Sequence, residues 1–355
     1  MGKLATTYQY IADILSYKSS KDDLEKTLGN KDFDWDTMVV EGSRHLVLPT
    51  IYCRLTSKDL LHLLPEELNT YLEEITSLNE NRNAQLLIQI NHLSELLKAH
   101  EIEHVFLKGA ALICGGYYND LAERMIGDID ILISNHQLDM AFELLKENSY
   151  YPMEQTLGND FFEHRHLSRL KSDAFIGVVE LHRILLPSDK DKELSSPNIL
   201  ASKQIINGIF IPSTIHLMRH TILNYQINDN GSLYNSINFR SAYDSIVLLE
   251  NIKDPSLIGK GKKITTYLNI LALFFEDIPK AYASSNFTTR FYRFKLKHLS
   301  FYKFWVKTLK VYIFLKTVLK RVPHFFVNKA YRMALFKDRK RVFKLFKSFF
   351  YNRKE

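Results

Sequence analysis

Two aspartates alternate with isoleucines at the start of an apolar run, Asp128-Ile129-Asp130-Ile131-Leu132-Ile133. β-branched residues favour a strand, and successive side chains of a strand point to opposite faces. Asp128 and Asp130 therefore point to the same side. Carboxylates this close repel each other unless a cation lies between them, and Mg²⁺ accepts such oxygen ligands. The run therefore predicts a strand that begins at a metal site.

A third carboxylate is needed to complete a two-metal site. Glu180 is the best candidate because it lies in an apolar, strand-like run, Val178–His182, where an unpaired carboxylate would be costly. Glu154 and Glu163 are the nearby alternatives. The predicted metal ligands and catalytic residues are Asp128, Asp130 and Glu180.

A second motif, Lys108-Gly109-Ala110, follows the short apolar strand predicted at residues 105–107. A glycine between a strand and a helix lets backbone N–H groups approach an anion, and the helix dipole adds to the attraction. We expect a triphosphate to bind here. Lys108 either binds phosphate or only flanks the strand.

Arg124 precedes the two aspartates by four and six residues. Its guanidinium has the fork geometry that suits phosphate, so it joins Lys108, Gly109 and Ala110 as a predicted nucleotide-binding residue. The alternative is a structural ion pair with Asp128 or Asp130.

These segments resemble the polymerase-β-like nucleotidyltransferase superfamily and, within it, a poorly characterised bacterial nucleotidyltransferase family. The resemblance rests on Leu107–Leu112, Arg124–Asp130 and Glu180–His182, and it spans roughly residues 30–250. It implies transfer of a nucleoside monophosphate from an NTP, with ATP as the expected donor, to an acceptor hydroxyl with release of pyrophosphate. It also implies Mg²⁺ or Mn²⁺ as the cofactor. Ala110 departs from the Gly-Ser or Gly-Gly of the superfamily, so a hydroxyl contact is lost.

Several histidines accompany these motifs. His182 shares a strand face with Glu180 and is interpreted as a buried, hydrogen-bonded residue, with acid/base work as the alternative. His164, His166 and His182 are the candidates for lining the substrate site. His216 and His220 have the spacing of a zinc pair, but they lack the glutamate of His-Glu-x-x-His, so a helix packed on the core is favoured.

The predicted fold is α/β (α+β), with a small mixed sheet between helical flanks. Leu86, Leu87, Ile90, Leu93 and Leu97 have helical spacing, Ser134 and Gln137 fit a capping box, and residues 162–170 and 175–185 fit a hairpin. The expected parts are an N-terminal helical region (1–100), a nucleotidyltransferase core (101–211), a helical region (212–286) and a basic, aromatic-rich helical tail (287–355).

Charge is distributed unevenly along the chain. Residues 287–355 contain 13 Lys and 7 Arg against 2 acidic residues, a net charge of +18, so the remainder carries −11 of the total +7. An anionic membrane surface or RNA is the expected partner of this tail, and the alternative is a set of helices that covers the core with a solvated basic side. With two cysteines and no long uncharged apolar run, the chain is expected to be cytoplasmic, or peripheral at the membrane.

The acceptor is the least constrained part of the prediction. A small molecule, a protein or an RNA fits the motifs equally well. Two other functions remain open at this stage, namely a catalytically inactive nucleotide-binding module and a membrane- or RNA-associated interaction protein. The presence of all three carboxylates favours the enzyme.

Overall fold

The computed structural model describes residues 3–153, 161–162, 164–187, 191–259 and 261–344. Its N-terminal part is helical. The helices are α1 (Lys3–Leu15), α2 (Lys21–Leu28), α3 (Trp35–Arg44), α4 (Leu48–Ser57) and α5 (Glu66–Ala99).

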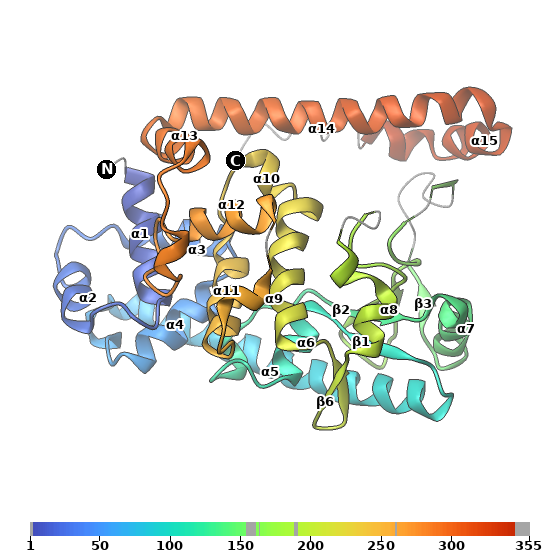
Figure 1. Ribbon diagram of the computed structural model, residues 1–355, viewed down its shortest axis with the longest axis horizontal. Coiled ribbons are helices and arrows are strands. Elements are labelled where there is room, and N and C mark those ends of the chain that lie inside the picture. Colours follow the sequence, from blue (N-terminus) through green and yellow to red (C-terminus); the bar gives the residue numbers. More distant parts are fainter. Residues whose placement is uncertain (1–2, 154–160, 163, 188–190, 260, 345–355) are drawn as a thin grey trace.

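Helix α5 is the long support under the sheet (Figure 1). Leu86, Ile90, Leu93 and Leu97 are buried on one face, as their spacing predicts. One of its buried polar residues, Gln89, forms hydrogen bonds with both the N–H and the carbonyl of Gly177. Gly177 lies just before strand β5 (Val178–His182). The helix therefore determines where β5 begins.

The core is a five-stranded mixed sheet, which confirms the predicted fold class. Its strands are β1 (His104–Phe106), β2 (Asp128–Ile133), β3 (Tyr151–Pro152), β4 (Leu170–Lys171) and β5. Their order is β1-β2-β5-β4-β3, and only β2 and β5 run parallel. The first part of the predicted hairpin is less regular than expected. Among its described residues, β4 and an isolated bridge between His166 and His182 pair it with β5.

Helix α6 (Lys108–Cys114) follows β1, and α7 (Leu138–Glu147) follows β2. The predicted capping box between Ser134 and Gln137 does not form. The Gln137 amide instead accepts the N–H of Glu103 and donates to the carbonyl of Glu101, so the loop before β1 takes up its hydrogen bonds.

A two-stranded hairpin, β6 (Gln204–Ile206) and β7 (Ile209–Ile211), was not predicted from the sequence. Its turn is Asn207-Gly208, and both residues have positive φ. Asn-Gly between apolar residues is a strong sequence signal for this kind of turn, and it was available in the sequence.

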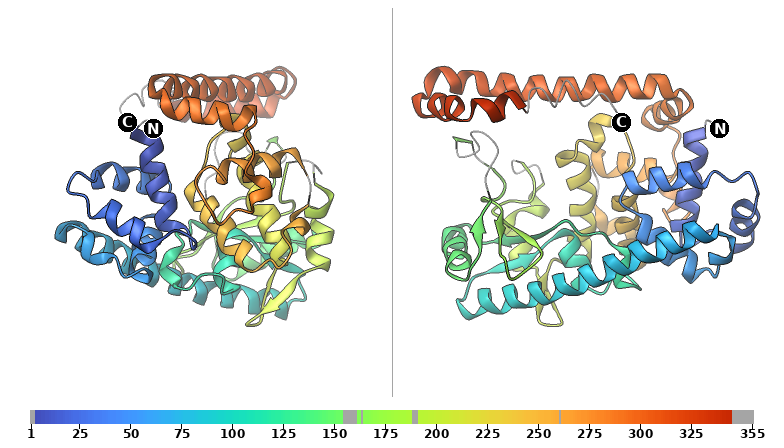
Figure 2. Two further views of the ribbon diagram at one scale, coloured as in Figure 1. Left: turned by 60° about the vertical axis from the view of Figure 1, so that its left-hand side comes forward. Right: turned by 180° about the vertical axis from the view of Figure 1, so that it is seen from behind.

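The rest of the described chain is helical, as predicted from residue 212 onward. The remaining helices are α8 (Ser196–Ala201), α9 (Thr214–Leu223), α10 (Gly231–Tyr234), α11 (Phe239–Glu250), α12 (Lys262–Leu271), α13 (Phe287–Lys297), α14 (Leu299–Val327) and α15 (Lys329–Lys337). Helices α9 and α11 pack together beside the sheet, whereas α14 lies along one edge of the molecule in every view (Figures 1 and 2). Across the described chain, every helix is too short or too charged to cross a lipid bilayer.

Candidate active site

The parallel pairing of β2 with β5 brings the acidic residues together. Asp130 lies opposite Glu180 in the register, and Asp128 lies opposite Val178. Because side chains alternate along a strand, Asp128, Asp130, Glu180 and His182 all point to one face of the sheet. The sequence predicted this for the two aspartates, and the register adds the other two residues.

Three of these side chains form a tight, buried group. Asp130, Glu180 and His182 are each at most 3% exposed, and each offers a ligand atom within 4.8 Å of the others. His182 Nε2 lies 2.7 Å from Asp130 Oδ1 and 3.3 Å from Glu180 Oε2. Asp128 belongs to the same face but is 33% exposed at its side chain. The closest ligand set in the described chain therefore contains His182 where the sequence led us to expect Asp128.

Lys108 provides one of the two cations that hold the carboxylates. It lies at the start of α6 with a φ of 51°, a left-handed backbone that non-glycine residues rarely adopt. Its Nζ lies 2.6 Å from Asp130 Oδ1. The strained turn thus directs the ammonium group at the buried aspartate.

Arg169 provides the other cation, and sequence reasoning missed it. Its Nε lies 2.5 Å from Glu180 Oε1, and a terminal guanidinium nitrogen lies 3.7 Å from Asp128 Oδ2. No local sequence pattern indicates this role, because Arg169 comes to lie opposite Glu180 through the pairing of Leu170 with Val179. Arg169 therefore links the exposed carboxylate to a buried one.

The pKa values follow from this arrangement. Burial and the neighbouring Asp130 raise the pKa of Asp128. Burial works in the same direction at Asp130, but the charge of Lys108 and the hydrogen bond from His182 hold its pKa well below the usual range. At Glu180 the effect of burial is again overcome, chiefly by the hydrogen bond from His182, and the pKa falls to about 2. Asp130 and Glu180 are therefore ionised at neutral pH.

A comparison with known protein families identifies the family of the chain. A family model described as an uncharacterised nucleotidyltransferase matches residues 31–254, more than half of the chain. The chain belongs to this nucleotidyltransferase family. The match begins just before α3 and ends just after α11, close to the extent expected from the sequence, and so it includes all of the site residues above. None of the curated proteins matches the chain in sequence.

Arg124 has a different partner from the one predicted. Its guanidinium is buried and binds both carboxylate oxygens of Asp244 on α11, with Nε 2.8 Å from Oδ1 and a terminal nitrogen 2.9 Å from Oδ2. The structural alternative named Asp128 or Asp130 as the partner, and this was wrong. Both aspartates are held by other cations, while α11 brings Asp244 to Arg124 from far along the chain. Its assignment to nucleotide binding stays a prediction.

Gly109 and Ala110 are buried in the first turn of α6. A Cβ at Gly109 would lie 3.1 Å from the Ile126 side chain. The glycine therefore allows α6 to pack closely against the loop that leads into β2. The role of Gly109 and Ala110 in phosphate binding also stays a prediction.

The histidines lie at different distances from the carboxylates. His166 Nε2 is 3.7 Å from Glu180 Oε2, so His166 lies at the site, while His164 is half-buried in the segment just before it. His220 is buried on α9, and burial lowers its pKa to about 3, with further effects from the charges of Lys108 and Asp130. The alternative carboxylates Glu154 and Glu163 lie outside the described residues.

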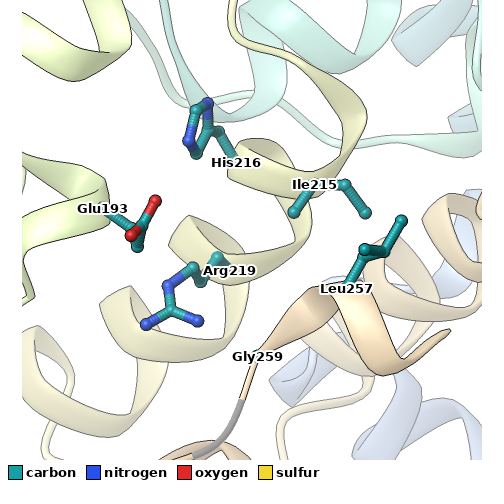
Figure 3. A pocket seen from close by; sticks show the side chains of 6 residues that line it. All are labelled: Glu193, Ile215, His216, Arg219, Leu257 and Gly259. Atoms are coloured by element: carbon teal, nitrogen blue, oxygen red, sulfur yellow. The ribbon is translucent and has the colours of Figure 1, made fainter.

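His216 shares α9 with His220 but is only half-buried, and its Nδ1 lies within hydrogen-bond distance of Ser202 and Ser213. It lines a separate cavity of about 330 Å³ together with Glu193 and Arg219 (Figure 3). Arg219 is held there by Asp191, at 2.7 Å, and by the carbonyl of Ile258. The two histidines therefore belong to a packed helix, as the sequence favoured.

Proposed function

We propose that this member of the nucleotidyltransferase family is a metal-dependent enzyme of the polymerase-β-like superfamily. It transfers a nucleoside monophosphate from an NTP, with ATP as the expected donor, to an acceptor hydroxyl and releases pyrophosphate. The observation that carries the proposal is the buried Asp130–Glu180–His182 group, with Asp128 on the exposed side of the same sheet face.

The donor set fits a divalent cation. Two ionised carboxylates and one imidazole offer oxygen and nitrogen ligands close together, which suits Mn²⁺ and, with further oxygens from phosphate, Mg²⁺. Asp130, Glu180 and His182 are the residues proposed to hold the ion, and Asp128 is placed to add a ligand from the substrate side. When bound, the ion supplies neutralisation of phosphate charge and acidifies the acceptor hydroxyl.

Lys108 and Arg169 are proposed to bind phosphate during turnover. Each is held by a carboxylate that would also be a ligand of the ion, so each would be available to phosphate in the metal-bound enzyme. Arg169 is 55% exposed at its side chain and is therefore the more accessible of the two. Their charges then complement the triphosphate of the donor.

Arg240 is a third candidate for phosphate binding, and sequence reasoning did not single it out. It lies in the first turn of α11 and is half-buried. Among the described residues its guanidinium has no hydrogen-bond or salt-bridge partner. Burial lowers its pKa, as does the charge of Arg124, while Asp244, Asp229 and Asp128 act in the opposite direction. A half-buried cation without a partner, close enough to feel Asp128, is well suited to bind an anionic substrate.

The test is release of pyrophosphate from ATP with Mg²⁺ or Mn²⁺, together with transfer of α-labelled nucleotide to small-molecule, protein and RNA acceptors. Asp130→Asn and Glu180→Gln are each expected to lower turnover by about 100-fold or more, because each removes a charged ligand from a buried set. Asp139→Asn, an exposed position on α7, is the matched control and should keep full activity.

Binding provides a readout that does not depend on finding the acceptor. Calorimetry should show weak binding of Mn²⁺ alone and tighter binding in the presence of a non-hydrolysable NTP, because phosphate supplies the missing ligands. Asp130→Asn should abolish this enhancement. Undiminished turnover in either carboxylate variant, or tight Mn²⁺ binding that ignores the nucleotide, would contradict the proposal.

A further inference from the structure

Helix α14 lies outside the family match and is attached to the body only along part of one side. Near its start, Trp305 donates its indole N–H to the carbonyl of Tyr234, at 3.3 Å. Near its end, His324 packs against the rings of Phe162 and Tyr331. No residue of this 29-residue helix is buried. The helix therefore contributes no fully buried side chain to the core.

The opposite side of α14 presents a continuous apolar surface to solvent, which we call the outer stripe. At 100° per residue its members fall within a sector of about 100°, so they lie on one face of the helix. They span about 33 Å along the helix axis at 1.5 Å per residue. Each is between 39% and 72% exposed: Phe304, Val311, Leu315, Val318, Leu319, Val322 and Phe326.

Basic residues border the outer stripe on both sides. At 100° per residue, Lys303, Lys307, Lys310 and Arg321 fall along one border, and Lys316 falls along the other. No acidic residue occurs between Phe287 and Lys337, that is, in α13, α14 and α15. Long lysine side chains at such a border can extend their ammonium groups past the apolar surface to an anionic layer.

From this geometry we infer that the outer stripe of α14 docks on the surface of a membrane that contains anionic lipids. The helix lies in the plane of the interface, with the apolar side chains among the acyl chains and the lysines at the headgroups. Every member of the stripe is exposed, and α14 lies along one edge of the molecule (Figures 1 and 2), so the stripe is accessible to a membrane surface. The inference is independent of the proposed function, because no residue of the candidate active site takes part.

Two other occupants fit the surface less well. A nucleic acid would require cations or flat rings at the centre of the contact, whereas the centre of the stripe consists mainly of valine and leucine. A second copy of the helix packed on the stripe would bring like-charged lysine borders together. An anionic lipid layer satisfies the apolar centre and the basic borders at once.

The experiment is co-sedimentation of the full chain with vesicles of phosphatidylcholine alone or of equal parts phosphatidylcholine and phosphatidylserine. The wild type is expected to bind the anionic vesicles, with an affinity that falls as salt is added. Leu315→Glu/Leu319→Glu should weaken binding by at least about tenfold, because two carboxylates would enter the apolar layer.

The chain offers a matched control on α5. Leu78 and Ile88 are 61% and 64% exposed, close to the 51% of Leu315 and the 68% of Leu319. Leu78→Glu/Ile88→Glu introduces the same charge at similar exposure and should bind vesicles as the wild type does. Both double variants should keep the circular dichroism of the wild type, because none of the four side chains is buried.

Insertion can be detected directly with a tryptophan on the stripe. Trp305 faces the body, so it does not report on the stripe. Leu319→Trp in a Trp305→Phe background should shift its emission to the blue with anionic vesicles and not with single-stranded oligouridine. Vesicle binding that survives Leu315→Glu/Leu319→Glu would overturn the inference. So would binding of the wild type to oligouridine but not to vesicles, or a dimer in sedimentation velocity that this variant dissociates.

Discussion

At the scale of single residues, the site contains two carboxylates whose burial opposes their ionisation. Asp130 and Glu180 are buried, which alone would favour their neutral forms. Lys108, Arg169 and His182 reverse this preference by direct contact. The carboxylates are therefore kept ionised in an apolar layer, where a cation gains the most from binding them.

Lys108 achieves its contact at the expense of backbone strain. A lysine with a positive φ is less stable than a glycine in the same conformation by about 1 kcal/mol. Lys108→Gly should therefore give a higher free energy of unfolding than Lys108→Ala by about that amount in urea titrations. Both variants lose the ion pair with Asp130, so the difference between their free energies of unfolding reports the backbone strain.

An alanine variant as stable as the glycine variant would mean that the turn relaxes out of the left-handed conformation. Nucleotide affinity should fall in both variants, because the ammonium group is missing from each. Strain maintained next to a charged group is commonly associated with a functional site.

At the scale of elements, α11 contributes to the site from outside the sheet. It carries Asp244, which holds Arg124, and Arg240, which has no partner among the described residues. The two arginines thus have contrasting environments, although both lie within the family match. This contrast distinguishes Arg124, which is paired inside the fold, from Arg240, which we propose binds phosphate.

Matched substitutions can test this contrast. Arg124→Gln should lower the free energy of unfolding by about 3 kcal/mol, because it leaves the buried Asp244 carboxylate without its counterion. Arg240→Gln should leave stability nearly unchanged but raise the KM for ATP by about tenfold, because it removes a charge-assisted phosphate contact. Thermal unfolding and initial rates provide the two measurements. If the two effects are exchanged between the variants, the assignment of roles is wrong.

At the scale of the whole molecule, the basic tail is not one structural unit. Tyr292 and Leu296 of α13 are buried in the hydrophobic core, and the Lys295 ammonium is buried against the carbonyl of Tyr234, at 2.6 Å. Burial lowers the pKa of Lys295 to about 7. Helix α14, by contrast, has no buried residue. The basic segment that begins at Phe287 therefore contains one helix that belongs to the core, α13, and one that lies at the surface, α14.

Two truncations should differ accordingly. A chain that ends at His298 keeps α13 and should fold, bind nucleotide and lose vesicle binding. A chain that ends at Asn286 loses two large core side chains and should be destabilised by about 4 kcal/mol or more. Circular dichroism and thermal unfolding of both chains check this. Equal stability of the two truncations would show that α13 does not belong to the core.

The sequence by itself determined what depends on neighbouring residues. The alternation in β2 placed Asp128 and Asp130 on one face, and the spacing of three and four residues identified the buried side of α5. Period and face are properties of a contiguous segment, so they can be read without knowing its partners. The net charge of the tail is likewise a property of a contiguous segment, so it can be counted from the sequence.

Only the tertiary structure decided which distant residues meet. The parallel register of β2 with β5 brought His182 to Asp130, the β4–β5 pairing brought Arg169 to Glu180, and the packing of α11 gave Arg124 its partner Asp244. The sequence also left open which face of α14 is exposed. These contacts depend on the register and packing of segments far apart in the chain, and a one-residue slip of a strand would turn every side chain of the site to the other face.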